Sequence, residues 1–325
     1  MNNTKVVALG GGHGLAVTLA ALRQVTSQIT AIVTVADDGG SSGRLRQEFG
    51  VLPPGDLRMA LTALAGDNEW GQTWRATLQH RFSSDGDMDG HAVGNLLIVA
   101  LWQMLDGTTE ALELIGQLLG ARGRVLPMSN VPLSVEADIT RVLDGREWHT
   151  TVHGQRMVAV ADGRVDAIRL HPSAPQACPE AVAALEQADW IVFGPGSWYT
   201  SVIPHLLVPE LAAAIAHSPA RRLVTLNLVP QRGETQGYTA ADHLAALHSY
   251  APGIGFDVVI VDPEAVSDLG ALEALAAERG GKVLVRAVRA ADGSPAHDPL
   301  ALAGAYRDSF CDRLDGRGGE RDGPQ

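Results

Sequence analysis

The chain has 325 residues and a mass of 34.2 kDa, and 46% of its residues are hydrophobic, which is enough for a sizeable core. Its 37 acidic residues outnumber its 25 basic ones, so the formal net charge is −12 at pH 7. This balance argues against a nucleic-acid binder and against a protein attracted to anionic membranes.

The N-terminus runs directly into a short apolar strand, and no apolar run approaches membrane-spanning length. We therefore expect a cytoplasmic protein without membrane insertion. The only cysteines, Cys178 and Cys311, stand in unrelated contexts, so neither a disulfide framework nor a cysteine metal site is expected.

The first strand, over residues 6–9, is followed by the glycine-rich turn Gly10–Gly14 and an apolar helix. In this arrangement the amides at a helix N-terminus bind phosphate. The dinucleotide fingerprint G-x-G-x-x-G is incomplete, because Leu15 stands where the last glycine belongs. Close packing of a strand on a helix also requires glycine, so the turn fits a structural role as well. We favour nucleotide or phosphate binding, because an acidic strand end follows.

That acidic strand end is the predicted functional centre. A β-branched strand over residues 30–36 ends in Asp37 and Asp38, which precede Gly39-Gly-Ser-Ser-Gly43, and Asp56 then opens a helix over 57–64. Ligands collect at the carboxyl ends of strands in an open α/β sheet. Adjacent aspartates repel each other unless a cation, an arginine or solvent screens them. The structural alternatives are a solvated Asp-Gly turn and an N-cap role for Asp56.

The rest of the chain alternates predicted strands with predicted helices. Apolar helices are expected from Gly94-Asn95 onward and over 111–119. A β-rich excursion around 125–170 contains short alternating runs, predicted as antiparallel strands over 133–139, 148–152, 157–160 and 165–170. Further strands are expected over 190–193, 222–228, 256–261 and 282–288, with helices over 180–187, 239–247 and 299–314. Gly194–Ser197 forms a second tight glycine loop after a buried strand.

This alternation predicts a doubly wound, mainly parallel, Rossmann-like α/β sheet. We expect one nucleotide-binding domain over residues 1–314 and a disordered tail over 315–325, which is rich in Gly, Asp and Arg.

The motifs resemble those of the gluconeogenesis factor family, the bacterial branch of the 2-phospho-L-lactate transferase (CofD)-like superfamily. The matching segments run in order along the chain, at 10–15, 29–44, 53–56, 94–97, 122–127, 193–197 and 233–243. His13 and Trp198 are small departures from the family pattern. Beyond about residue 262 the match is looser.

The resemblance implies a cytoplasmic regulator that binds UDP-sugars such as UDP-N-acetylglucosamine and supports cell shape and wall synthesis during gluconeogenic growth. It leaves open a protein partner in cell-wall synthesis and a homo-oligomer. The enzymes of the superfamily transfer a phospholactyl group with magnesium, so a Mg²⁺-dependent transferase using the same pocket is the alternative. A nicotinamide-dependent dehydrogenase is a third hypothesis, disfavoured by the incomplete glycine fingerprint.

The predicted ligand contacts are the two glycine loops, the acidic strand end and three polar or charged side chains further along. They are Gly11, Gly12, His13, Asp37, Asp38, Ser41, Ser42, Asn95, Gly194, Gly196, Ser197, Tyr238 and Arg286. Tyr238 and Arg286 are included because the resemblance puts UDP-sugar contacts at those positions. Asp37, Asp38 and Asp56 are candidate Mg²⁺ ligands, since magnesium prefers hard oxygen donors and substrate phosphates. No catalytic residue is assigned.

Overall fold

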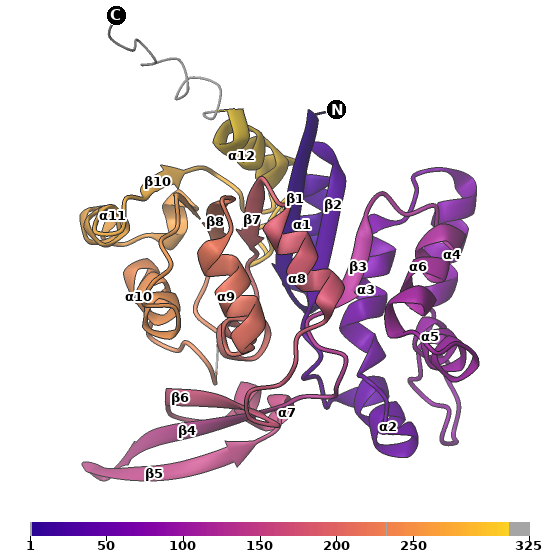
Figure 1. Cartoon of the computed structure of the whole chain (residues 1–325). Helices are drawn as coiled ribbons and strands as arrows, with labels where there is room; N and C mark the ends of the chain where they lie inside the picture. The colour runs from indigo at the N-terminus through magenta and orange to yellow at the C-terminus, as the bar shows by residue number, and fades with distance from the viewer. Residues whose placement is uncertain (1, 232, 312–325) are drawn as a thin grey trace, which may run out of the picture.

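A seven-stranded sheet forms the centre of the computed structural model, which describes residues 2–231 and 233–311 (Figure 1). Its strand order is β10-β9-β8-β7-β1-β2-β3, and every neighbouring pair is parallel. The strands are β1 (Asn2–Gly10), β2 (Thr26–Val33), β3 (Arg124–Pro127), β7 (Trp190–Phe193), β8 (Arg221–Thr225), β9 (Val258–Val261) and β10 (Lys282–Val285). The predicted doubly wound parallel sheet is confirmed.

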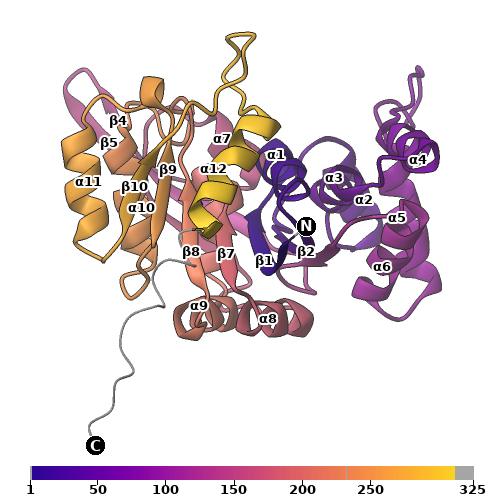
Figure 2. The same cartoon turned by 90° about the horizontal axis from the view of Figure 1, so that it is seen from above.

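Helices cover both faces of this sheet. Figure 2 places α8 and α9 on one face and α1 and α12 on the other. The helices are α1 (Gly12–Leu22), α2 (Gly40–Phe49), α3 (Pro54–Leu64), α4 (Glu69–Gln79), α5 (Val93–Met104), α6 (Thr108–Leu118), α7 (Gln155–Val160), α8 (Pro179–Glu186), α9 (Pro209–His217), α10 (Ala240–Tyr250), α11 (Leu269–Ala277) and α12 (Pro299–Cys311). Three short turns accompany them: a π-helical η1 (Trp198–Val202) and the 3₁₀ turns η2 (Ile203–Leu206) and η3 (Pro263–Ala265).

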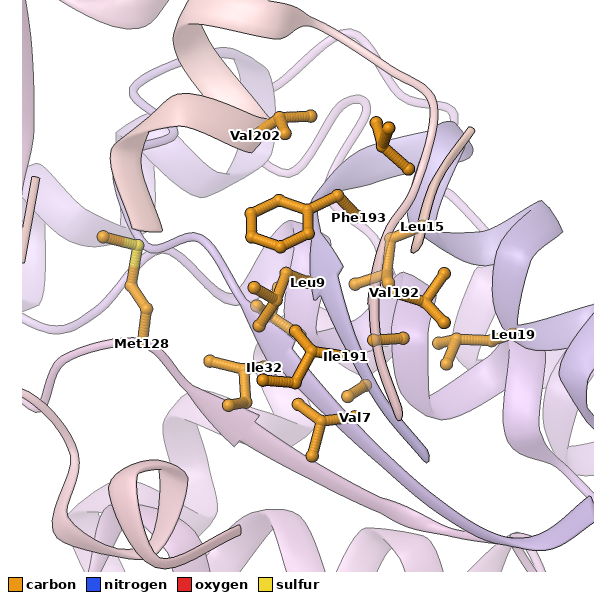
Figure 3. Packing of buried hydrophobic residues seen from close by; sticks show 14 of the residues in the cluster. Val7, Leu9, Leu15, Leu19, Ile32, Met128, Ile191, Val192, Phe193 and Val202 are labelled. Atoms are coloured by element: carbon orange, nitrogen blue, oxygen red, sulfur yellow. The ribbon is translucent and has the colours of Figure 1, made fainter. Parts of the chain in front are cut away.

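The core lies between the sheet and these helices. Every residue of β7 and of β9 is buried, as expected for parallel strands covered on both faces. Figure 3 shows Leu15 and Leu19 of α1 beside Val192 of β7, and these three side chains are at most 1% exposed. The first helix is thereby fixed against the strand pair whose ends carry both glycine loops.

A small antiparallel sheet leaves the body between β3 and α8, in the order β5-β4-β6. Its strands are β4 (Ser134–Leu143), β5 (Arg146–His153) and β6 (Arg164–His171). The strand predicted over 157–160 is wrong, because that segment belongs to helix α7. Gly154 interrupts the extended chain at φ 92°, and the carboxylate of Asp38 accepts a hydrogen bond from the amide of Arg156 in the first turn of α7.

Within the described residues, no single helix is both long and apolar enough to cross a membrane. One pair, residues 198–206 with α9, meets those criteria jointly and is bent by 71°. The predicted tail over 315–325 lies outside the described residues.

Candidate functional site

The two glycine loops lie side by side at the carboxyl edge of the main sheet, because β1 and β7 are parallel neighbours. A Cβ added at Gly14 would lie 1.9 Å from the carbonyl oxygen of Pro195 and 2.9 Å from Cα of Gly196. Only glycine allows this contact between the start of α1 and the second loop. Gly194 has a packing role of the same kind, since a Cβ there would lie 2.6 Å from Oγ1 of Thr18 on α1.

The first loop also contacts the beginning of α3. A Cβ on Gly11 would lie 2.5 Å from Oδ2 of Asp56, and the amide of Gly12 donates a hydrogen bond to the same carboxylate. The N-cap of α3 is Pro53, so Asp56 lies inside the first turn. The N-cap interpretation of Asp56 is therefore wrong, and this buried carboxyl faces the glycine loop.

Asp56 and Asp37 form a half-buried acidic pair. Burial raises the pKa of Asp56 to about 7, and the neighbouring charge of Asp37 adds to this rise. Burial also raises the pKa of Asp37, although the amide of Gly39 (2.9 Å) and the hydroxyl of Ser42 donate hydrogen bonds to it. Two carboxyls in one desolvated place favour holding a proton or a cation between them.

Asp38 is separated from this pair. Its Oδ1 accepts a hydrogen bond of 3.0 Å from the amide of Arg156, so its carboxylate is engaged with α7. Across residues 2–231 and 233–311, no group of three or more His, Cys, Asp or Glu side chains is placed to hold a metal ion. Asp37 and Asp56 therefore lie together, with hard oxygens of the kind that a divalent cation prefers, whereas Asp38, the third predicted magnesium ligand, is engaged with α7.

A buried chain of polar side chains lies behind the acidic loop. Nε of Arg58 donates to Oδ1 of Asn95 (2.9 Å), and Nδ2 of Asn95 donates to Oγ of Ser41 (3.0 Å). Oγ of Ser41 is also 3.0 Å from Nδ1 of His91. The predicted residues Asn95 and Ser41 are brought together, whereas His91 was not among the predicted site residues. Asn95 lies in the first turn of α5, whose N-cap is Ala92.

Ser42 joins the same loop to α3, because its Oγ accepts a hydrogen bond of 3.0 Å from the amide of Gly55. Ser41 and Ser42 are both buried in the first turn of α2. They hold the end of the acidic loop and leave little of their own side chains on the surface.

The second glycine loop is fixed by two residues that sequence reasoning did not assign. Asn227 accepts from the amide of Gly196 (2.8 Å) and donates to its carbonyl (2.9 Å). Glu234 is 3% exposed and accepts from the amide of Tyr199 (2.8 Å) and the hydroxyl of Thr200 (2.7 Å). Donors just after Ser197 are therefore satisfied by the protein itself. Glu234 stands in the family-like segment 233–243, which was the available signal.

A cavity of about 390 Å³ opens where the loops after β1, β7 and β8 meet the segment between β10 and α12. This volume is in the range of small-molecule sites. Of the predicted contacts, His13 and Gly196 line it. The complete lining is His13, Gly14, Val17, Pro195, Gly196, Asn227, Leu228, Val229, Gln231, Pro295, Ala296 and His297.

Tyr238 and Arg286 do not line this cavity. The hydroxyl of Tyr238 is 2.7 Å from that of Tyr199, and its ring packs against His243. Arg286 follows the edge strand β10, and its guanidinium pairs with Asp308 of α12 at 3.0 Å. Three strands separate β10 from β1, so the structure does not bring Arg286 to the glycine loops.

A doubly wound parallel sheet with glycine loops, buried carboxyls and a cavity at its carboxyl edge defines the Rossmann-like class of α/β proteins. The chain matches the family described as 2-phospho-L-lactate transferase CofD over residues 6–286, and it belongs to that family, in the branch named gluconeogenesis factors.

Relatives in several bacteria carry that branch name. A Mycobacterium tuberculosis gluconeogenesis factor is 48% identical over 312 residues, covering 95% of this chain and 90% of its own. The Bacillus subtilis gluconeogenesis factor is 39% identical over 265 residues, covering 81% of this chain and 80% of the relative. A crystal structure of a Bacillus halodurans protein superposes with a TM-score of 0.83 at 35% identity, covering 94% of this chain and 99% of that one.

Proposed function

We propose that this protein is a cytoplasmic regulatory factor that binds a UDP-sugar, such as UDP-N-acetylglucosamine, in the cavity at the carboxyl edge of the sheet. In this role it supports cell shape and wall synthesis during growth on gluconeogenic carbon. The family and the names of its relatives support a role in gluconeogenic metabolism. The nucleotide-sugar ligand is what the resemblance to that family implies, and the cavity at the start of α1 supports it.

The observation that carries the proposal is that the start of α1 lines this cavity with backbone amides that have no acceptor in the described part of the chain. The amide of Gly12 is taken by Asp56, but the next two amides, of His13 and Gly14, have no acceptor among the described residues. Unpaired amides at a helix N-terminus favour a phosphate. With a net charge of −12, the protein has no general positive field to hold an anion, so such local donors matter.

Calorimetric titration tests this function. Wild-type protein should bind UDP-N-acetylglucosamine in preference to NAD and GTP. Val17→Trp places a large ring in the cavity and should weaken binding at least about tenfold. Leu300→Trp on α12 is the matched control, because Leu300 is 70% exposed and does not line the cavity. Absence of UDP-sugar binding to the wild type would refute the proposal.

A Mg²⁺-dependent transferase is the second candidate, and the half-buried pair Asp37 and Asp56 beside the first glycine loop favours it. These two carboxylates would hold the ion, which supplies positive charge to the phosphates of a bound nucleotide. Regulator and transferase are separated by turnover. Incubation with Mg²⁺ and UDP-N-acetylglucosamine should leave the nucleotide intact if the protein only binds it, and steady consumption would identify an enzyme.

Signalling by a regulator requires a second component. We propose a protein partner from cell-wall synthesis and leave a homo-oligomer as the alternative recipient of the signal. Light scattering with and without UDP-N-acetylglucosamine tests whether the protein forms a homo-oligomer. A ligand-dependent change in mass would support self-association, and a constant mass would favour a separate partner.

A further inference from the structure

We propose that Gln231 and His297 determine ligand specificity by accepting hydrogen bonds from donor groups of the bound ligand. The inference rests on the proposed function and deepens it, because it assigns an orientation to the ligand. The phosphate would lie at the start of α1, and the end that carries N–H or O–H groups would face Gln231 and His297.

Both residues carry a buried polar atom that has no partner. Oε1 of Gln231 and Nε2 of His297 are buried, and within the described part of the chain neither has a hydrogen-bond partner. Both residues line the same cavity of about 390 Å³. Buried polar atoms are nearly always satisfied in folded proteins, so orphan atoms on two residues that line one cavity point to a ligand that satisfies them.

The orphan atom of His297 is an acceptor. The ring donates a hydrogen bond to the carbonyl of Leu226, and because Nε2 has no partner, Nδ1 is the donor. A neutral imidazole that donates through Nδ1 has Nε2 as its acceptor. Burial lowers the pKa of His297 and favours the neutral ring, and Arg289 lowers it further whereas Asp262 opposes this.

The cavity is therefore polarised. The wall contributed by α1 offers the amides of His13 and Gly14, which are donors. The wall contributed by the loop after β8 and by the segment before α12 offers two acceptors, on Gln231 and His297. A nucleotide-sugar has the matching arrangement, with acceptor oxygens on its diphosphate and donor groups on the base and on the sugar. Either the uracil N–H or the sugar hydroxyl and amide groups can satisfy the acceptors.

Titration of UDP-N-acetylglucosamine and of UDP into matched variants tests the proposal. Gln231→Leu removes the amide, and His297→Asn keeps a donor for Leu226 while removing the Nε2 acceptor. Each variant should weaken binding about 3- to 10-fold, the loss expected for one hydrogen bond. Gln236→Leu, exposed in the same loop as Gln231, and His217→Asn, exposed at the end of α9, are the controls and should bind like the wild type.

The two ligands separate the two donor sources. If binding of UDP weakens as much as binding of the UDP-sugar, the base faces the acceptors. If only the UDP-sugar is affected, the sugar faces them. Unchanged affinity of both variants for both ligands overturns the proposal. If the wild type binds neither UDP compound, the proposed function fails, and GDP and NAD replace them in the same titration. The acceptor pair is then refuted if a nucleotide that binds the wild type binds both variants equally, or if none binds.

Discussion

The carboxylate of Asp56 accepts a hydrogen bond from the amide of Gly12 and so joins the first turn of α3 to the first turn of α1. This contact buries a carboxyl directly beneath the first glycine loop. It also explains why Gly11 has no side chain, since a Cβ there would collide with Asp56 and Thr34 at 2.5 Å. The acidic pair and the first glycine loop are therefore in contact, although neither Asp37 nor Asp56 lines the cavity of about 390 Å³.

Replacing Asp56 by Asn should change how stability depends on pH. The ordinary pKa of 3.8 rises to about 7 in the fold, so the folded protein binds a proton more tightly than the unfolded chain. This contribution to stability is complete below pH 3.8 and is lost as the pH rises through 7. Asp56→Asn cannot ionise and can still accept from Gly12. As the pH rises from 4 to 8, the unfolding free energy of Asp56→Asn should therefore increase by about 2–4 kcal/mol relative to that of the wild type.

Urea unfolding at a series of pH values measures this difference. Asp38→Asn serves as the control, because its amide oxygen can still accept from Arg156 and both carboxyls of the acidic pair are kept. If the difference in unfolding free energy between the wild type and Asp56→Asn stays constant from pH 4 to 8, the pKa of Asp56 is not raised.

Magnesium should act through two of the three clustered aspartates. Mg²⁺ is expected to strengthen nucleotide binding in the wild type, and this effect should disappear in Asp37→Asn and in Asp56→Asn, because an amide is a poorer ligand for a hard cation. Asp38→Asn should retain it. Calorimetric titrations of the nucleotide with and without Mg²⁺ measure this effect. If only Asp38→Asn loses it, Asp38 is the magnesium ligand, and Asp37 and Asp56 are not.

The sheet could be predicted because its strands are short, buried and separated by glycine turns, as at Val6–Gly14 and Trp190–Ser197. The helix predicted over 239–247 is confirmed as α10, and Thr239 and Asp242 form a capping box at its start. The segment 157–160 was mistaken for a strand because its start is set by a hydrogen bond to Asp38, more than a hundred residues earlier.

Side-chain directions at the site were harder to predict than the site's place in the fold. Adjacent residues Asp37 and Asp38 look equivalent in the sequence, yet one faces Asp56 and the other α7. The placement of Gln231 and His297 on one cavity depends on loops that meet only in the folded chain, so no local pattern reveals it.

Gly14→Ala should destabilise the protein and weaken nucleotide binding together. The new methyl group would overlap the carbonyl of Pro195, and relieving that contact would separate the two glycine loops. Overpacking of this kind typically costs about 1–3 kcal/mol. Gly304→Ala is the control, because nothing lies within 4 Å of a Cβ at that position of α12, and it should stabilise by roughly 0.5–1 kcal/mol. A Gly14→Ala protein as stable as wild type would show that the loops do not pack as described.

Glu234→Ala should loosen the second glycine loop. It would leave the amide of Tyr199 and the hydroxyl of Thr200 without their acceptor inside the protein. Each unsatisfied buried donor costs about 1–3 kcal/mol, so the two together should lower the unfolding free energy by about 2–6 kcal/mol. Glu264→Ala, whose side chain is 75% exposed, should change stability by less than about 1 kcal/mol. Equal stability of the two variants would argue that Glu234 is dispensable.

Arg286→Ala should leave nucleotide affinity unchanged. Its guanidinium pairs with Asp308 away from the cavity, and both side chains are half exposed, so the ion pair contributes less than about 1 kcal/mol. The family resemblance alone favours the opposite result. Calorimetry on this variant decides between them, and a tenfold loss of UDP-sugar affinity would return Arg286 to the binding site.

A crystal structure of the protein with UDP-N-acetylglucosamine tests the central claim most directly. The account predicts difference density for the diphosphate within hydrogen-bonding distance of the amides of His13 and Gly14, with the rest of the ligand extending toward Gln231 and His297. A ligand bound instead in the cavity of about 430 Å³ at the opposite edge of the sheet, which Lys5 and Arg124 line, would contradict it.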